Sequence, residues 1–346
     1  MSTNNEFEYI YKRIDSEDLI YEHINERYGL MSENAEDIKQ DLGIINDKQD
    51  KLTIEIDYQE SVKDIAQPNK NRKKKSKPSV VNKNFNIELE QLPTSLKSNT
   101  NGNSTTGFVV WQSTFFFLNW LLKHKGKSFL NWDADKNVDI IELGTGINCS
   151  NSIVLANFTR NFYISTDQKG ILNKLKMNCL NNLKEIKKYN NTNKLNIASL
   201  EINNSSKQFR SSSLNINIQT DNETEGDDFR YEVLHLDWCD DATYQNFISE
   251  TDFIKNNDKD LLSILAVDVI YNEFLIAPFI KTVERLLKLR KDSQAIVVLQ
   301  LRDESIIIDF LSECLPYFNI DVIEDLDSAN GVFSCSRHVI YKLTLL

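Results

Sequence analysis

The sequence predicts an α/β protein with a doubly wound, mostly parallel sheet that carries one antiparallel strand. The run Asp139–Ile147 (D-I-I-E-L-G-T-G-I) is typical of a buried strand that breaks into a glycine turn before a helix. From Val138 onward, seven strand-like segments follow one another, and helical segments separate most of them. Only a polar stretch around Asn330-Gly331 separates the last two strands, which predicts a terminal β-hairpin and hence the antiparallel strand.

The individual elements follow from the spacing of apolar residues along the chain. Strands are expected at Val138–Leu143, Phe162–Thr166, Tyr231–Leu236, Leu261–Val269, Ala295–Leu301, Ile320–Ile323 and His338–Leu345. Helices are expected at Val110–Lys123, Ser150–Phe158, Lys169–Lys188, Leu275–Arg290 and Glu304–Leu315. The fourth strand is largely apolar, as expected for a parallel strand that is covered on both faces of the sheet.

Residues 79–346 are predicted to form this domain, and residues 1–78 an acidic N-terminal extension. Apolar residues at helix-like spacing over Glu6–Ile24 predict short helices in the extension. A cationic run, Lys70–Lys77, lies in a proline-flanked segment that predicts an exposed basic linker at 69–78. That run is a solvated linker, a nuclear import signal or a patch that contacts the ribosome.

Two further segments belong to the predicted domain. Phe85–Leu92 alternates apolar and polar residues over most of its length, which predicts a half-buried strand. Segment 190–228 is rich in Asn and Ser and poor in aromatic residues, and it is too long for an ordinary loop of a compact domain. We therefore expect a disordered surface insertion there.

Composition and charge exclude several classes of protein. A formal charge of -11 argues against a general nucleic-acid binder, and no direct readout of nucleic acid is expected. No apolar run approaches the roughly 18 residues of a membrane helix, and no signal peptide is visible. We expect a cytoplasmic protein that can also enter the nucleus, and a monomer. The five cysteines form no C-x-x-C pair and the four histidines have no metal-ligand spacing, which predicts reduced thiols and no metal site.

Ligands of a doubly wound sheet bind at the carboxyl ends of its strands, and four predicted strand ends carry suitable residues. Gly144-Thr145-Gly146 follows the first strand, and Asp167 follows the second, where it suits ribose hydroxyls. Asp237-Trp238 follows the third and offers an acceptor for an amine beside a ring that can stack on a purine. Asp268 and Tyr271 place an acid and a phenol after the fourth.

Most of these residues also have a purely structural interpretation. The glycines can form a simple tight turn, and Asp167 can cap the helix that starts near Lys169. Trp238 and Tyr271 can be ordinary aromatic residues of the core. Asp268 is harder to explain in this way, because an acid after a long apolar run costs stability unless it is solvated or paired.

The glycine turn favours S-adenosylmethionine over NAD as the ligand. Gly144-x-Gly146 begins the dinucleotide pattern G-x-G-x-x-G, but Cys149 occupies the third glycine position. Asn148 fills the last slot of a G-x-G-x-G pattern. Glu142 precedes the first glycine by two residues, where class I methyltransferases often carry an acid.

Taken together, these motifs resemble the methyltransferase-like 21 family of seven-strand protein lysine methyltransferases, and most closely its fungal members that act on ribosomal proteins. The resemblance covers roughly residues 85–346. Its motifs here are Gly107-Phe-Val-Val-Trp111, Glu142-Leu-Gly-Thr-Gly146, Thr166-Asp167, Leu236-Asp-Trp238 and Asp268-Val-Ile-Tyr271. Asn148 in place of a glycine, the long insertion and residues 1–80 depart from the family pattern, which puts cofactor affinity and substrate choice in doubt.

The resemblance implies a Rossmann-like class I methyltransferase that transfers a methyl group from S-adenosyl-L-methionine to a protein lysine. It implies that the cofactor site is lined by Trp111, Gly144, Thr145, Gly146, Asp167, Trp238 and Val267. It implies that Asp268 and Tyr271 face the target lysine. Our hypothesis for the mechanism is that Asp268 holds the incoming ammonium and orients the lone pair of the neutral amine. The implied substrate is a basic large-subunit ribosomal protein, the one that forms the mobile stalk.

Three other functions stay open from the sequence. A small-molecule methyltransferase would share the cofactor site but not the D-x-x-Y motif. An NAD-dependent oxidoreductase would need a catalytic Tyr/Lys pair or a histidine in the pocket, and no such spacing stands out. A non-catalytic interaction module would keep the fold, but the nearly complete set of residues at the strand ends argues against a decayed site.

Overall fold

The computed structural model of the protein describes residues 9–36, 38, 41–62, 79–94, 106–130, 132, 138–186, 188–189, 194–198, 213–216, 228–256, 260–326 and 331–346. The strands are β1 Tyr9–Ile14, β2 Lys51–Val62, β3 Ser79–Glu90, β4 Val138–Leu143, β5 Phe162–Asp167, β6 Lys194–Ala198, β7 Ser213–Ile216, β8 Asp228–His235, β9 Leu261–Val267, β10 Ser293–Gln300, β11 Phe318–Asp325 and β12 His338–Leu345. The helices are α1 Glu17–Glu33, α2 Gln112–Lys123, α3 Gly126–Phe129, α4 Ser150–Leu155, α5 Lys169–Asn181, α6 Asp241–Glu250, α7 Ile276–Leu287 and α8 Glu304–Cys314.

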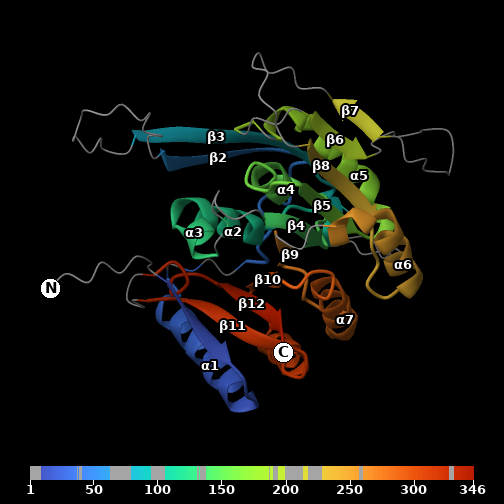
Figure 1. The fold of residues 1–346 in the computed structure, drawn as a ribbon. Helices are drawn as coiled ribbons and strands as arrows, with labels where there is room; N and C mark the ends of the chain where they lie inside the picture. The colour runs from blue at the N-terminus through green and yellow to red at the C-terminus, as the bar shows by residue number, and fades with distance from the viewer. Residues whose placement is uncertain are drawn as a thin grey trace, which may run out of the picture.

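The doubly wound sheet is confirmed, and its seven predicted strands are β4, β5, β8, β9, β10, β11 and β12. In the described part of the chain they belong to a ten-stranded sheet of order β1-β11-β12-β10-β9-β4-β5-β8-β6-β7 (Figure 1). β4 pairs in parallel with both β5 and β9, so the chain winds outward in two directions from β4. Among the seven, β12 is the antiparallel strand, since it runs opposite to β10 and β11.

Both faces of the central strands are buried against helices, as the apolar pattern predicts. Ile140 and Ile141 are neighbours on β4, and they belong to two different hydrophobic cores because successive side chains of a strand point to opposite faces. One core includes Phe117 of α2 and Leu175 of α5. The other includes residues of α1, α7 and α8, among them Phe310. This double cover holds the ends of β4, β5 and β9 in fixed positions.

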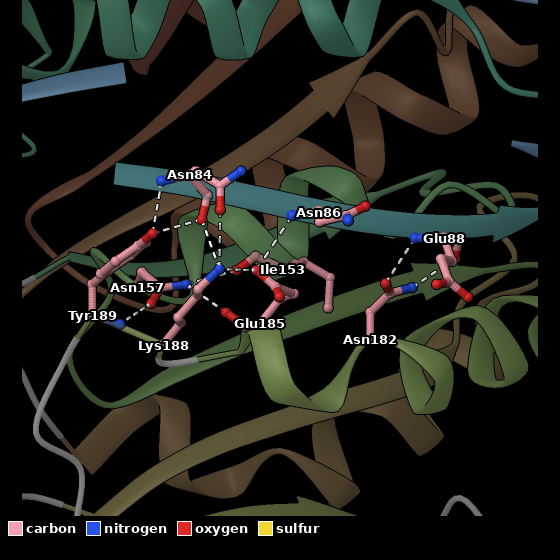
Figure 2. Close-up of polar contacts among 9 residues, drawn as sticks. All are labelled: Asn84, Asn86, Glu88, Ile153, Asn157, Asn182, Glu185, Lys188 and Tyr189. Atoms are coloured by element: carbon pink, nitrogen blue, oxygen red, sulfur yellow. Dashed lines mark hydrogen bonds and ion pairs between the residues drawn. The ribbon is translucent and has the colours of Figure 1, made fainter. Parts of the chain in front are cut away.

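β2 and β3 form a separate two-stranded sheet that packs over the helices on one face. Side chains, rather than a neighbouring strand, satisfy the second edge of β3 (Figure 2). The Asn182 amide accepts a hydrogen bond from Glu88 N at 2.9 Å and donates one to Glu88 O at 2.7 Å. The Tyr189 hydroxyl accepts from Asn84 N at 2.7 Å and donates to Asn84 O at 2.6 Å. The strand expected at Phe85–Leu92 is therefore present as the last part of β3, which begins earlier, at Ser79, and ends two residues sooner, at Glu90.

The start of the chain differs from the short helices expected over Glu6–Ile24. Tyr9–Ile14 is a strand that pairs antiparallel with β11, and α1 begins only at Glu17, where the Ser16 hydroxyl accepts a hydrogen bond from Leu19 N at 3.4 Å. The open edge of β11 supplies backbone partners that local spacing cannot reveal. Contacts of β1 with β11, and of β2 with β3, cross the predicted boundary at residue 78. The predicted linker at 69–78 lies outside the described residues.

Segment 190–228 also differs from the expected disordered insertion. It contains β6, which pairs in parallel with β8, and β7, which pairs antiparallel with β6. The edge of β8 offers backbone hydrogen bonds, so a polar segment can extend the sheet without an apolar pattern of its own. The other residues of this segment before Asp228 lie outside the described part of the structure. Within the described ranges, no helix has the length and apolar character to cross a membrane.

Candidate active site

A cavity of about 210 Å³ opens where the chain reverses its winding direction, at the carboxyl ends of β4, β5, β8 and β9. Every residue that the sequence singled out for the site lines it: Trp111, Gly144, Thr145, Gly146, Asp167, Trp238, Val267, Asp268 and Tyr271. The structure thus brings the whole set together in one place. Sequence reasoning missed several other lining residues, among them Leu42, Thr106 and Arg302; Asn148, noted only as a departure, also lines the cavity.

The glycine turn after β4 allows backbone to approach the cavity closely. Gly144 and Gly146 both have φ of +64°, a left-handed conformation that side chains disfavour. A Cβ on Gly144 would lie 2.8 Å from Val269 Cγ1 and 3.3 Å from the Trp238 ring, and one on Gly146 would lie 3.1 Å from Gly107 O. Larger residues at either position would therefore change the wall of the cavity.

Asp167 fixes the glycine turn from the end of β5. Its two carboxylate oxygens accept hydrogen bonds from Gly146 N and Gln168 N, each at 2.6 Å. It does not cap α5, whose N-cap residue is Gln168. Burial raises the pKa of Asp167 to about 6, although both backbone hydrogen bonds oppose the shift. A carboxylate has further lone pairs, so it can hold this turn and still accept hydrogen bonds from ligand hydroxyls.

Glu142, two residues before Gly144, does not line the cavity. Its side chain accepts hydrogen bonds from Asn151 Nδ2 at 2.8 Å and from the Tyr163 hydroxyl at 2.9 Å. The residue is 2% exposed, and burial raises its pKa to about 7. This acid therefore links β4 to α4 and β5 inside the core.

Asp268 lies beyond β9 with both oxygens occupied. Its Oδ1 lies 2.6 Å from Arg302 Nη1, and its Oδ2 accepts hydrogen bonds from Arg302 Nη2 at 2.6 Å and from Ser113 Oγ at 2.8 Å. The backbone has φ of 59°, and the Asp268 N–H donates to Val298 O at 2.7 Å. Arg302 stands just after the fifth predicted strand, and this place at a strand end is the sequence signal that marks it.

Trp111, Thr106 and Tyr271 form one side of the opening. Thr106 joins the other two, since its carbonyl accepts a hydrogen bond from Trp111 Nε1 at 3.0 Å and its hydroxyl donates to the Tyr271 hydroxyl at 3.0 Å. Tyr271 is 40% exposed, so it is not a core residue. The Arg302 guanidinium lies 5.1 Å from the centre of the Trp111 ring, within range of a cation–π contact.

The N-terminal part of the chain also contributes to the cavity. Leu42 lines it, and its carbonyl accepts a hydrogen bond from Arg302 Nε at 3.2 Å. Gly43 has φ of +82°, and its carbonyl accepts from Gln112 N at 2.7 Å. Ile44 then bridges to the backbone of Trp111. The sequence carries no motif that marks this segment as part of the site.

The residues present fit an adenosyl amino acid such as S-adenosylmethionine. The glycine turn leaves space for close approach of ligand to backbone. Asn148 is 6% exposed and lines the cavity, and within the described residues its Nδ2 has no hydrogen-bond partner. A buried donor of this kind suits a ligand carboxylate. The described residues contain no group of three or more His, Cys, Asp and Glu side chains that could hold a metal ion.

Several curated proteins are similar to the chain over nearly its whole length. The ribosomal lysine N-methyltransferase 5 of Vanderwaltozyma polyspora is 32% identical, over 94% of this chain and 98% of its own length. The protein of the same name from Lachancea thermotolerans is 32% identical over 90% and 93%. That of Candida glabrata is 34% identical over 96% and 98%. No protein-family model matches the chain.

Proposed function

The chain belongs to the family of ribosomal lysine N-methyltransferase 5, and on this basis we propose that it methylates a lysine of a large-subunit ribosomal protein with S-adenosyl-L-methionine. A protein-lysine methyltransferase needs a methyl donor of the S-adenosylmethionine type. It also needs a place for the amine beside that donor. The cavity offers both at once, and this observation carries the proposal.

The cofactor would lie against the part of the cavity formed by Gly144, Gly146, Asp167 and Trp238. The two glycines would let it approach the backbone, Asp167 would accept hydrogen bonds from its ribose hydroxyls, and the Trp238 ring would lie beside its purine. When bound, S-adenosyl-L-methionine supplies a methyl group on a positively charged sulfur. Asp268, at the end of the neighbouring strand, lines the same cavity and would face the attacking amine.

Lysine needs help to become a nucleophile. Its pKa of about 10.4 in solution leaves it mostly as ammonium at neutral pH, without a free lone pair. After the ammonium has lost a proton to solvent, the amine lone pair forms the new N–C bond and the electron pair of the broken C–S bond stays on sulfur. Asp268 aligns the amine for this step, and Tyr271 contributes its ring and hydroxyl at the opening. Positioning of this kind accounts for much of the rate of such a displacement.

The substrate part of the proposal rests on the relatives' name and on charge. Those relatives are named for a ribosomal lysine. A formal charge of -11 favours encounter with a basic protein, because opposite charges accelerate association. The stalk protein of the large subunit is the proposed target and a monomer the proposed active form. The cytoplasm, together with the nucleus, is the proposed location.

Mass spectrometry of ribosomal proteins from cells with and without this chain tests the proposal. We expect one large-subunit protein to lose a methyl-sized mass increment when the chain is absent. Wild-type protein should restore the increment, and Asp268→Ala should not, although Asp268→Ala should still bind S-adenosylhomocysteine. No change in any ribosomal protein would reject the ribosomal substrate, and restoration by Asp268→Ala would reject the role of Asp268.

A further inference from the structure

Asp268 is already paired with a cation, Arg302, before any substrate enters. What this pairing does to a bound lysine rests on the proposed function. Arg302 contacts both oxygens of this carboxylate at 2.6 Å, and the Asp268 side chain is only 3% exposed. Ser113 occupies a further position on Oδ2 at 2.8 Å. A lysine ammonium that reaches Asp268 therefore meets a carboxylate whose charge Arg302 has balanced.

Arg302 is held firmly in this position. Its Nη2 also donates to Gln300 Oε1 at 2.6 Å, and its Nε donates to Leu42 O at 3.2 Å. The guanidinium lies 5.1 Å from the centre of the Trp111 ring. Besides Asp268, therefore, Gln300 and Leu42 hold Arg302 through hydrogen bonds, and the Trp111 ring lies beside its guanidinium. We therefore expect Arg302 to stay when the substrate binds.

We propose that Arg302 is a positioning residue that makes the site select the neutral amine of the target lysine over its ammonium form. A fixed guanidinium repels a second cation and lowers the pKa of a lysine bound within about 4–6 Å. The Asp268 carboxylate can still accept a hydrogen bond from the N–H of a neutral amine. The proton is lost to solvent on binding, so the lone pair is free to form the N–C bond while the C–S electron pair stays on sulfur.

Other charged groups near this pair do not reproduce the effect above neutral pH. Burial lowers the pKa of His338 to about 4, so its ring is uncharged there. Burial raises the pKa of Asp167 to about 6, so that carboxylate is ionised above pH 7. The remaining charged or titratable groups that face the pair or share its cavity are Asp41, Asp237, Cys239, Tyr271 and Arg337. Burial raises the pKa of the Cys239 thiol, so this group holds its proton more tightly than a free thiol does. A pH profile between about pH 7 and 9.5 therefore reports mainly on the bound lysine, and Tyr271→Phe checks the phenol.

The test is the pH dependence of kcat, which reports ionisations in the enzyme–substrate complex. The probe is the large ribosomal subunit from cells that lack this chain, with S-adenosyl-L-methionine at saturation. The acid limb of this profile is the fall in kcat on its low-pH side. In Arg302→Gln the midpoint of the acid limb should move up by about one pH unit, because the bound lysine keeps its proton to higher pH. At pH 7.5 kcat should fall about tenfold while KM falls as well, since the unbalanced Asp268 then binds ammonium better.

Three further variants separate charge from structure. Gln300→Glu has nearly the same shape but places a carboxylate on Arg302 Nη2, so the acid limb should again move up. Arg302→Lys keeps the charge and loses the paired contact, so kcat should fall with the acid limb in place. Arg285→Gln is the matched control, because Arg285 has a similar side-chain exposure (26% against 24%) and pairs with Asp241 away from the cavity.

These variants decide whether Arg302 favours the neutral amine. The role of Arg302 would be overturned if the acid limb stayed unchanged both in Gln300→Glu and in Arg302→Gln. If Arg302→Gln fails to bind S-adenosylhomocysteine, the substitution has disrupted the cavity that Arg302 itself lines, and Gln300→Glu alone decides. Absence of methyl transfer by the wild-type protein would instead reject the proposed function, so the two failures are distinguishable.

Discussion

Asp268 holds a backbone conformation that glycine adopts far more easily than aspartate does. Its φ of 59° costs on the order of 1 kcal/mol, and the neighbouring contacts maintain it. The Asp268 N–H bonds Val298 O, and Arg302 and Ser113 bond the carboxylate. Strain in such a place indicates that the direction of this carboxylate matters more than local stability.

Glu142 allows a prediction about pH at the same scale. Burial raises its pKa from 4.5 to about 7, so the folded protein holds this proton more tightly than the unfolded chain does. The stability that comes from this tighter proton binding by Glu142 is therefore fully present below about pH 4.5. It is lost as the pH rises toward 7, where Glu142 ionises in the folded protein. Glu142→Gln cannot ionise and keeps a neutral side chain of the same shape.

Urea unfolding at several pH values measures this effect. The free energy of unfolding of Glu142→Gln minus that of the wild type should grow between pH 4.5 and 7 by up to about 3 kcal/mol, and should stay constant above pH 8. A difference that does not change with pH would contradict the raised pKa of Glu142.

At the scale of elements, hydrogen bonds from the side chains of Asn178 and Asn182 connect β3 to the part of the molecule that carries the glycine turn. An isolated pair of strands is marginally stable in water, so β3 depends on side-chain partners along its second edge. Asn178 of α5 links this edge to the glycine turn, since its Oδ1 accepts from Glu90 N at 2.9 Å and its Nδ2 donates to Ile147 O at 2.8 Å. Asn182 provides the next link, to Glu88 (Figure 2).

Asn182→Ala should therefore destabilise the protein, because it leaves Glu88 N and Glu88 O without their partner. We expect a loss of at least about 2 kcal/mol in the free energy of unfolding and faster hydrogen exchange at the Glu88 amide. Asn246→Ala, on the exposed face of α6, is the matched control and should change stability by less than about 0.5 kcal/mol. Unchanged protection of the Glu88 amide in Asn182→Ala would show that other contacts hold β3.

At the scale of the whole molecule, the N-terminal residues form part of the fold and of the site. β1 extends the sheet beside β11 (Figure 1). Leu42, which follows α1 in the chain, lines the cavity. Buried His23 of α1 contacts the Tyr341 hydroxyl of β12 at 3.0 Å, which ties α1 to the last strand. The site therefore combines residues from the first and last parts of the chain.

The sequence predicted the parts of the fold that local patterns determine. The seven central strands and the cluster of residues at their ends follow from apolar runs and from what stands after them. β1, β6 and β7 could not be predicted in this way, because they are stabilised by backbone hydrogen bonds to open sheet edges that only the folded molecule provides.

The candidate site shows the same division. Asp268 is recognisable in the sequence because an acid after an apolar run costs stability unless it is solvated or paired, but the sequence pattern alone does not name its partner. Arg302 follows the fifth strand and was within reach of the same argument. Leu42 was not, because a glycine with positive φ and a single backbone bridge bring its segment to the cavity, and neither has a sequence pattern.

Transfer of a labelled methyl group tests the central claim most directly. The purified wild-type protein and Asp268→Asn would each be incubated with S-adenosyl-L-methionine labelled on its methyl group and with large ribosomal subunits from cells that lack this chain, and the product hydrolysed to amino acids. The account predicts label in methyllysine with the wild type, and a loss of at least about 100-fold with Asp268→Asn. Label in another amino acid, or equal transfer by Asp268→Asn, would contradict it.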